Sequence, residues 1–467
     1  MTIDQIESLP MVRRSLQDFA RINPYFNVDA GDASATRVTV AGRNNRYNTI
    51  QIDGAVNNDV FGLADTGTPG GQADTQPVSL DAIQELQLVV SPYDVRQSGF
   101  TGGGINAITR SGSNQWHGSV YGSTRDQSYV GELNGREVSS FEEDQYGARL
   151  GGPIVHDKSF FFVSGETNNN DTPTGFSADG SATNQFGDPA LAQAVGDILR
   201  TQYGFDPGGL GEFVEGTASD LLLVKIDWNA SPSHILTFRH NYVDAAKDRI
   251  ESGERNSGSR FSFPSYYYDF TSETNSTVVQ LNSTLSGSMF NEARVGYQVV
   301  KDRRAVPLLF PDIEIRDSGF EVNGGTNRFS QANALDQDIL EITDDVTWLV
   351  GDHTLTIGTH NEFFTFKNLF LDAARGFYGF TSLENFEAGI ASSYAVGFSN
   401  TGKDTVDFDV VQYGVYAGDQ LRVNDKLTLS YGLRVDIPTF PDSPSRNPLV
   451  DDALGIDTSD APSRMVL

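Results

Sequence analysis

Long segments in which apolar and polar residues alternate dominate the chain from Gln115 onward. In one of them Leu222, Val224, Ile226 and Trp228 occupy every second position, as one face of a β-strand does. About eleven such segments follow one another, several near the length at which a tilted strand crosses a bilayer. Their second face carries charged side chains, which the dry core of a β-sandwich would not tolerate. The pattern predicts an antiparallel transmembrane β-barrel.

The connections between these segments alternate in length. Tight turns interrupt WNASPSHILTF, WLVGDHTLTI and LRVNDKLTLS, and a Leu-Thr-apolar triplet follows each turn. The intervening links are long and cover residues 167–217, 244–273, 302–337 and 367–407. Outer-membrane barrels have short turns on the periplasmic side and long loops outside the cell. The alternation therefore predicts hairpins with outward-facing long loops.

The first hundred or so residues have a different pattern, typical of a small α/β module. Pro10 precedes a helical stripe of apolar residues, which predicts a helix with Pro near its start. The segment TRVTVAGRNNRYNTIQIDG alternates around an Asn-rich turn and predicts a β-hairpin. The stripe consists of Val12, Leu16, Phe19 and Ile22.

A second helix is expected after a loop rich in Gly, Pro, Asp and Thr. Ser79 is a candidate N-cap for a short helix carrying Leu80, Ile83 and Leu86, followed by a strand through Val90. We place the α/β module at residues 1–113 and the barrel part at residues 114–467.

Composition excludes several classes of protein. No apolar run approaches the length that a membrane helix needs, and a formal charge of −29 argues against a nucleic-acid partner. There is no Cys, so disulfides and thiolate metal sites are excluded, and the six His lack the spacing of a metal cluster. We expect no metal and no cofactor. The N-terminus lacks the apolar core of a signal peptide, so we expect either a cytosolic chain or a missing export signal.

The segment SLDAIQELQLVVSPYDVRQSGFTGGGINAITRSGSNQWHGSVY resembles the end of a TonB-dependent receptor plug joined to its first barrel strand. The segment AGRNNRYNTIQIDGAVNNDVFGL resembles the preceding plug hairpin, and QYGVYAGDQLRVNDKLTLSYGLRVD resembles a barrel hairpin of the same family. The resemblance covers nearly the whole chain apart from the long loops. It is closest to the Oar-like branch, in which a carboxypeptidase-regulatory-like domain commonly precedes the plug.

The resemblance implies a plug domain followed by an outer-membrane barrel that is incomplete in this chain. It also implies a receptor in the outer membrane that binds an extracellular ligand and imports it with energy relayed by TonB. The expected partners are the outer-membrane lipid, an unknown extracellular ligand, and TonB through a segment absent from this chain. We expect a fragment, because an odd strand count and an open sheet edge in lipid do not fit a finished barrel.

Two sets of residues have expected positions in such a fold. The three Trp residues lie near short turns or near the start of the barrel part, which predicts a shared periplasmic interface; the alternative is ordinary strand aromatics. The Gly-rich segment superficially imitates a dinucleotide fingerprint, but close packing and a bend in the plug explain it better. These residues are Trp116, Trp228 and Trp348, and Gly102, Gly103 and Gly104.

Aromatic clusters in the long loops are the candidates for ligand recognition. Exposed aromatic groups on loops often mark binding sites, although they also pack loops together or form an aromatic girdle. The candidates are Phe261, Phe263, Tyr266, Tyr267, Tyr268 and Phe270 in one loop and Phe377, Tyr378, Phe380 and Phe386 in another. On this basis we expect Tyr267→Ala or Tyr378→Ala to weaken ligand capture.

Catalysis is not expected. Acidic neighbours such as Glu142 with Glu143, or Asp344 with Asp345, face opposite sides of a strand and do not form a catalytic pair. The rival interpretation is a secreted or surface-attached β-rich adhesin or carbohydrate-binding protein. The rival predicts mixed turn lengths and two apolar faces packed in a common core.

Overall fold

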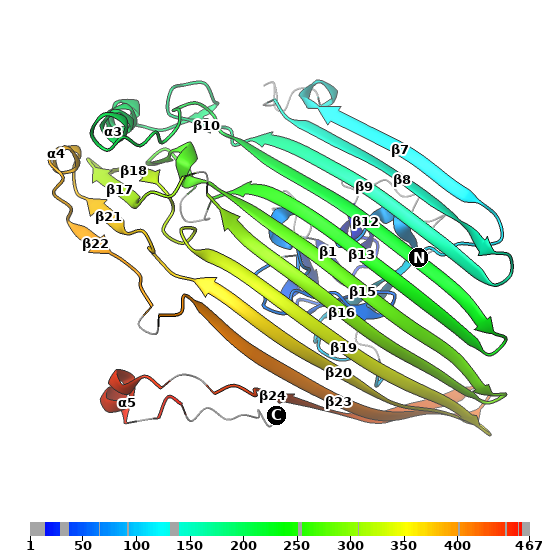
Figure 1. Ribbon diagram of the computed structural model, residues 1–467. Coiled ribbons are helices and arrows are strands. Elements are labelled where there is room, and N and C mark those ends of the chain that lie inside the picture. Colours follow the sequence, from blue (N-terminus) through cyan, green and yellow to red (C-terminus); the bar gives the residue numbers. More distant parts are fainter. Residues whose placement is uncertain are drawn as a thin grey trace.

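The computed structural model describes two units, an N-terminal α/β unit and a large antiparallel sheet with long connections (Figure 1). The described residues are 15–28, 37–64, 66–90, 93–130, 140–250, 255–306, 308–399, 402–443, 446–455 and 457–459. Among these residues no helix is both long enough and apolar enough to cross a membrane.

The large sheet is an antiparallel meander of eleven strands in which sequential strands pair. This matches the strand count expected from the alternating segments. The order from one edge to the other is β24-β23-β20-β19-β16-β15-β13-β12-β9-β8-β7. The strands are β7 (His117–Asp126), β8 (Glu142–Val155), β9 (Ser159–Pro173), β12 (Val214–Ser231), β13 (His234–Arg249), β15 (Tyr268–Ser286), β16 (Met289–Ala305), β19 (Asn333–Val350), β20 (His353–Phe370), β23 (Thr405–Asn424) and β24 (Leu427–Thr439).

Short turns and long connections lie at opposite ends of this sheet, as predicted. The last pairs before three short turns are Ser231 with His234, Val350 with His353 and Asn424 with Leu427. The long connections are shorter than predicted because the strands continue into them. The link expected at residues 167–217, for example, begins only after β9 ends at Pro173 and stops where β12 begins at Val214.

The two faces of the large sheet differ in chemistry. On β12, Leu221, Leu223 and Lys225 are buried on one face, where Leu223 packs in the core of the N-terminal unit and Lys225 bonds to Thr109, whereas Leu222 and Trp228 on the other face are exposed. Successive strands continue this exposed apolar band, which is the surface expected of a barrel wall in lipid. Its exposed members include Val295, Tyr297, Ile342, Trp348, Ile357, Val415, Leu433 and Val435.

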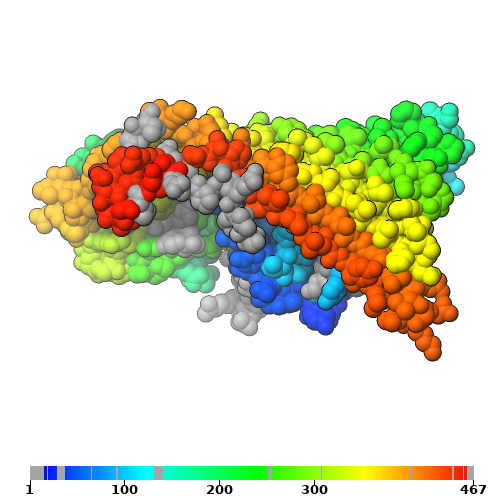
Figure 2. Space-filling view, turned by 90° about the horizontal axis from the view of Figure 1, so that it is seen from below, coloured from blue at the N-terminus to red at the C-terminus, as the bar shows by residue number. Residues whose placement is uncertain are grey.

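The N-terminal unit lies in the hollow of the large sheet (Figure 2). It contains a two-stranded sheet, β1-β2, and a four-stranded sheet of order β4-β3-β6-β5. Its core is apolar and is completed by Phe162 and Leu223 of the large sheet. The elements are α2 (Leu16–Ala20), β1 (Phe26–Val28), β2 (Val38–Val40), η1 (Asn45–Tyr47), β3 (Thr49–Ile52), β4 (Ala55–Val56), η2 (Gly71–Ala73), η3 (Leu80–Ala82), β5 (Ile83–Val90) and β6 (Gly103–Thr109).

Two predictions for this unit were wrong. The hairpin expected within TRVTVAGRNNRYNTIQIDG does not form, because β2 pairs back onto β1 while β3 pairs with β4 and β6. Ser79 does cap a helix and accepts a bond from the N–H of Asp81, but only the 3₁₀ turn η3 follows. Ile83 and Leu86, expected on that helix, belong to β5.

The helix predicted after Pro10 is present in part. Helix α2 carries Leu16 and Phe19, both 1% exposed in the core, whereas Ile22 lies beyond the helix and is exposed. Pro10 and Val12 lie outside the described residues.

The long connections fold together into a loop subdomain with its own sheet and core. The five-stranded sheet has the order β14-β18-β17-β21-β22, with parallel pairs between β14 and β18 and between β17 and β21. The elements are β10 (Phe176–Ser177), β11 (Asn184–Gln185), α3 (Pro189–Gln202), β14 (Arg260–Ser262), η6 (Pro264–Tyr266), β17 (Asp312–Asp317), β18 (Phe320–Gly325), β21 (Phe377–Phe380), α4 (Leu383–Glu387) and β22 (Ser393–Ala395). Two further elements are η4 (Gln127–Tyr129), in the connection between β7 and β8, and α5 (Pro448–Leu454), after β24.

Helix α3 shows why the loop subdomain is ordered. Asp188 caps it by accepting a bond from the N–H of Leu191, and Pro189 occupies its first turn. Leu191, Val195 and Leu199 then repeat at the helical spacing and are buried. They pack in one core with aromatic side chains from the other long connections.

Candidate functional site

A buried carboxylate ties the N-terminal unit to the large sheet. Asp53 follows β3 with a φ of 50°, in the left-handed region. Its Oδ2 atom lies 3.1 Å from Nη1 of Arg239 and 3.5 Å from Nζ of Lys225. The N–H and the hydroxyl of Thr109 also donate to this carboxylate. Burial alone would raise the pKa of Asp53, but the two cations and the Thr109 bonds hold it below its ordinary range. The side chain is therefore ionised at neutral pH.

Further contacts follow the inner face of β13. Asn241 donates to the carbonyl oxygen of Pro77 at 2.8 Å. Nearer the long connections, Lys247 pairs with Asp74. Residues on the inner faces of β12 and β13 thus contact the N-terminal unit repeatedly. We call these two inner faces the seam. Its polar members are Lys225, Arg239, Asn241, Lys247 and Arg249.

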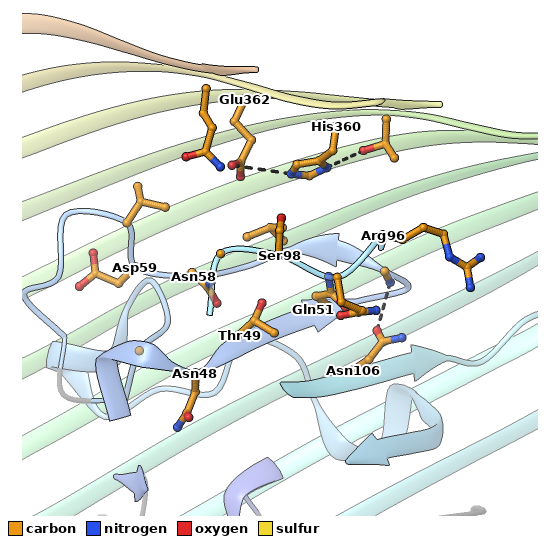
Figure 3. Close-up of a pocket in the computed structure, with 18 of the residues that line it drawn as sticks. Asn48, Thr49, Gln51, Asn58, Asp59, Arg96, Ser98, Asn106, His360 and Glu362 are labelled. Atoms are coloured by element: carbon orange, nitrogen blue, oxygen red, sulfur yellow. Dashed lines mark hydrogen bonds and ion pairs between the residues drawn. The ribbon is translucent and has the colours of Figure 1, made fainter. Parts of the chain in front are cut away.

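Away from the seam, a cavity of about 720 Å³ separates the N-terminal unit from β19, β20 and β23. Figure 3 shows His360 and Glu362 of β20 facing Asn58 and Ser98 of the N-terminal unit. We call this space the upper cavity. Its walls are mainly polar, and they include Asn48, Gln51, Asn58, Asp59, Arg96, Gln97, Ser98, Asn106, Arg294, Asp345, His360, Glu362, Phe364, Phe366, Gln412 and Tyr416.

Some polar groups around the upper cavity are occupied by the fold itself. Asn48 donates to the carbonyl oxygen of Val38, and Asn58 accepts from the N–H of Ile50. Asp59 accepts bonds from the loop N–H groups that follow it, while its burial raises its pKa. These bonds fix the three side chains in the cavity floor.

On the sheet side, His360 joins a short polar chain. Its Nδ1 atom lies 2.9 Å from the hydroxyl oxygen of Thr343, and its Nε2 atom lies 3.7 Å from Oε2 of Glu362. Toward the long connections the wall becomes aromatic, and Phe61 of the N-terminal unit packs edge-on against Phe366 with ring centroids 5.5 Å apart. The cavity thus combines hydrogen-bonding groups with an aromatic rim.

A second cavity of about 480 Å³ lies along the same strands. We call it the lower cavity, and its lining includes Thr347, Thr354, Thr356, Gly418, Gln420 and Arg434. On β20 the lower-cavity residues precede Gly358 and the upper-cavity residues follow it. Since β20 begins at a short turn, the lower cavity lies nearer the short-turn end.

The loop aromatics predicted to meet a ligand are mostly core residues. Phe263 is 0% exposed and Phe386 is 1% exposed, both within the core of the loop subdomain. Buried with them or beside them are Phe261, Tyr266, Tyr267, Tyr268, Phe270 and Phe380. Only Phe377 and Tyr378 are half-buried. The alternative of loop packing describes the buried set, and ligand binding by the remaining pair stays a prediction.

The glycine segment is packed as closely as its sequence suggested. A Cβ at Gly102 would lie 2.2 Å from Oδ1 of Asn48, and one at Gly103 would lie 2.7 Å from Cγ1 of Val40. At Gly104 a Cβ would lie 3.1 Å from Cγ2 of Thr49. No side chain fits here without displacing neighbours.

The three Trp side chains are exposed at the short-turn end of the large sheet. Trp228 and Trp348 lie in the last turn-proximal residues of β12 and β19, and Trp116 immediately precedes β7. Trp116 packs edge-on against Phe161, with ring centroids 5.5 Å apart.

Sequence reasoning missed the residues that join the two units. Nothing near Asp53 in the sequence points to Arg239, because 186 residues separate them. The one local signal is the Asp53-Gly54 pair after an alternating segment, which is typical of a turn. His360 and Glu362 lie two positions apart on β20, and this spacing alone places both side chains on one face of the strand.

Among the described residues no group of three or more His, Cys, Asp or Glu side chains is arranged to hold a metal ion.

A family model described as an outer membrane beta barrel domain matches residues 108–209 and 212–450. The TonB-dependent transporter Oar of Myxococcus xanthus is 32% identical over 139 residues, which are 27% of this chain and 12% of that protein. A probable TonB-dependent siderophore receptor, PirA, of Acinetobacter baumannii is 27% identical over 180 residues, which are 36% of this chain and 22% of that protein.

Two solved structures share the fold over most of the chain. The outer membrane transporter YddB from Escherichia coli superposes with a TM-score of 0.65 at 15% identity, covering 94% of this chain and 57% of that one. The siderophore receptor PirA from Acinetobacter baumannii gives a TM-score of 0.59 at 16% identity, again covering 94% and 57%. The chain therefore spans little more than half the length of these solved proteins.

Proposed function

Because the chain belongs to the outer-membrane β-barrel family, among the TonB-dependent receptors, we propose that it binds an extracellular ligand and imports it with energy relayed by TonB. The location is the outer membrane. In this proposal the N-terminal unit is the plug, the large sheet is part of the barrel wall, and the boundary falls between β6 and β7, near residue 113. The rival adhesin is not favoured, because the relatives are named transporters and receptors.

The outer surface of the large sheet indicates how the protein is oriented in the membrane. Its outer face carries an exposed apolar band, and Trp228 and Trp348 lie at the short-turn end of that band. Aromatic side chains collect where a membrane meets water, and short turns face the periplasm in such barrels. We place the short turns in the periplasm, and the loop subdomain outside the cell.

The observation that carries the proposal is the upper cavity between plug and wall. It lies on the concave side of the sheet, beneath the long connections, and combines polar side chains with Phe364 and Phe366. The seam fixes the plug to β12 and β13, so the cavity side is where a ligand has room. The ligand is then released inward because its affinity for the energised plug differs from its affinity for the resting plug.

The loop subdomain supplies the first surface that a ligand meets. Tyr378 is half-buried beside the exposed Tyr394, with ring centroids 4.8 Å apart. Phe377 lies under the guanidinium group of Arg328, 4.8 Å from it. We propose that this partly exposed aromatic group contributes to capture, whereas the buried aromatics hold the subdomain together.

The proposal is tested with the full-length receptor and a matched strain that lacks TonB. One relative, PirA of Acinetobacter baumannii, is named a siderophore receptor, so the first probe is a panel of siderophores loaded with radioactive iron. We expect accumulation that requires both the receptor and TonB, and full-length protein that fractionates with the outer membrane. Accumulation that persists without TonB would refute the energy coupling. Recovery of the receptor as a soluble monomer would refute the barrel and favour the adhesin.

A further inference from the structure

The two cavities lie one above the other along the same three strands. On β23 the lower cavity is lined by Gly418 and Gln420, and the upper cavity by Gln412 and Val410, which lie farther from the short turn. The same order holds on β19 and β20. A continuous route along this wall would therefore lead from the extracellular side to the periplasmic side.

One plug segment interrupts this route. Arg96 and Gln97 line both cavities, Tyr93 to Val95 line the lower one, and Ser98 and Gly99 line the upper one. We call residues 93–99 the crossing segment. Among the described residues, no other part of the plug lines both spaces.

The crossing segment is a compact turn held by its own bonds. The N–H of Gln97 donates to the carbonyl oxygen of Asp94 at 3.0 Å. The carboxylate of Asp94 accepts from the N–H of Arg96 at 3.0 Å and forms an ion pair with its guanidinium group at 2.7 Å. These bonds keep the segment in one compact turn.

The crossing segment packs on the wall over a pair of glycines, which we call its seat. Gly418 of β23 and Gly432 of β24 are cross-strand partners, and the side chain of Val95 rests over them. A Cβ at Gly418 would lie 3.0 Å from Cγ2 of Val95, and one at Gly432 would lie 2.4 Å from Cγ1. The missing side chains make room for Val95.

One arginine clamps the backbone of the seated segment. Nη1 of Arg434 lies 3.1 Å from the carbonyl oxygen of Val95 and 3.4 Å from that of Arg96. Asp436 holds Arg434 from one side at 2.9 Å, and the ring of Tyr416 lies 4.7 Å from its guanidinium carbon. Both bonds go to neutral carbonyl oxygens, whereas the seam also contains the ion pairs to Asp53 and Asp74.

We propose that residues 93–99 are a gate between the upper and lower cavities, opened when the segment leaves the Gly418–Gly432 seat while the plug stays fixed to the seam. This inference rests on the proposed import function and adds the route and the moving part. A ligand would descend along β19, β20 and β23. The seam at Asp53 and Arg239 would remain closed.

The test uses reporter cysteines, since the chain has none of its own. Thr356→Cys reports on the lower cavity and Gln412→Cys on the upper one. Whole cells carrying the full-length receptor are treated with a sulfonated maleimide dye too large for general porins. The rate of labelling measures access from outside.

Two variants loosen the gate by different means. Arg434→Gln removes the clamp on the two carbonyl oxygens, and Gly418→Ala adds a methyl group whose closest neighbours are the methyl groups of Val95. We expect labelling of Thr356→Cys to rise roughly tenfold in the first, through the loss of two hydrogen bonds, and about threefold in the second. Gln412→Cys should label readily in every background.

Matched controls separate the gate from general loosening. Gly165→Ala places a methyl group on a strand where the nearest atom, the carbonyl oxygen of Leu221, is 3.9 Å away. Asn241→Ala removes a seam bond. Both should leave Thr356→Cys labelling unchanged, with surface abundance and heat-modifiable migration showing that each variant folds.

The outcomes distinguish the two proposals. If Gln412→Cys labels but Thr356→Cys stays slow in both gate variants, the gate is refuted and the import proposal stands. If Asn241→Ala accelerates labelling as much as Arg434→Gln, the plug loosens as a whole and the local gate is refuted. If Gln412→Cys never labels, the upper cavity is closed to the outside and the import route itself is refuted.

Discussion

Replacing Asp53 by Asn should release the N-terminal unit, the proposed plug, from the seam without changing its shape. Asn has nearly the same size as Asp and tolerates the left-handed backbone that Asp53 adopts, with a φ of 50°. Its amide oxygen can still accept the bond from the N–H of Thr109. What the substitution removes is the negative charge that faces Arg239 and Lys225.

The size of the effect follows from burial. The side chain of Arg239 is 3% exposed and that of Lys225 is 9% exposed, so water cannot replace the lost carboxylate. Removing one partner of a buried ion pair costs about 3–5 kcal/mol, because an uncompensated charge remains. At about 1.36 kcal/mol per factor of ten, local opening at the seam should become roughly two to nearly four orders of magnitude more frequent.

Hydrogen exchange of the full-length receptor measures this opening. The amide of Thr109 bonds directly to Asp53 at 2.7 Å. The amide hydrogens of a peptide that contains Thr109 should therefore exchange faster in the variant, by the same factor as the increase in local opening. The matched control is Asp425→Asn, which breaks an exposed ion pair with Arg422 and should cost at most about 1 kcal/mol. An acceleration below about threefold at Thr109 would show that the charge does not hold the plug.

Four further outcomes are expected. Phe263→Ala empties a fully buried site in the loop subdomain and should cost about 3–5 kcal/mol there, seen as protease cleavage of that subdomain while the barrel stays intact. Gly102→Ala places a methyl group 2.2 Å from Oδ1 of Asn48 and should cost about 1–3 kcal/mol, seen as a lower urea midpoint for plug release. Tyr378→Ala should weaken ligand capture roughly tenfold at normal surface abundance; unchanged affinity would confine Tyr378 to loop packing. The lowered pKa of Asp53 means that its stabilisation is complete above the ordinary value of 3.8 and is lost as the pH falls below it, so acid should speed plug release more in the natural protein than in Asp53→Asn, which keeps only the other carboxylate contacts such as Asp74 with Lys247.

The sequence was sufficient for the large sheet because each hairpin is a local object. In β12 and β13 the alternation, the tight turn and the two faces all lie within one short stretch, and the register follows from the turn. Burial of Arg294 and Gln298 on the inner face confirms the predicted separation of polar and apolar positions.

Alternation predicts a strand but not the strand it pairs with, which explains why the hairpin predicted in the N-terminal unit was wrong. Val38–Val40 and Thr49–Ile52 both alternate and flank a turn-rich segment, yet they join different sheets. The first pairs with Phe26–Val28, which lies before it, and the second lies beside Gly104–Ala107. Core packing, which no local pattern records, decided between these pairings.

The candidate site was harder to predict for the same reason. Aromatic density around Tyr266 to Tyr268 signals burial as readily as binding, because large apolar rings fill a core wherever loops are long enough to enclose one. The cavities and the Val95 seat arise between segments hundreds of residues apart. Only the helical spacing of Leu191, Val195 and Leu199 was a readable sign that the connection after β9 is folded.

The parallel strand pairs of the loop subdomain impose an order of assembly. Asp312 pairs with Phe377, and between them the chain runs through the whole β19–β20 hairpin. The entropic cost of bringing the two ends of so long a loop together falls once that hairpin has formed, because the hairpin holds the ends near each other. The five-stranded sheet of the loop subdomain should therefore be among the last parts of the protein to fold. If that subdomain faces outward as proposed, a defect in the β19–β20 hairpin should be seen at the cell surface as a missing epitope far from the altered residue.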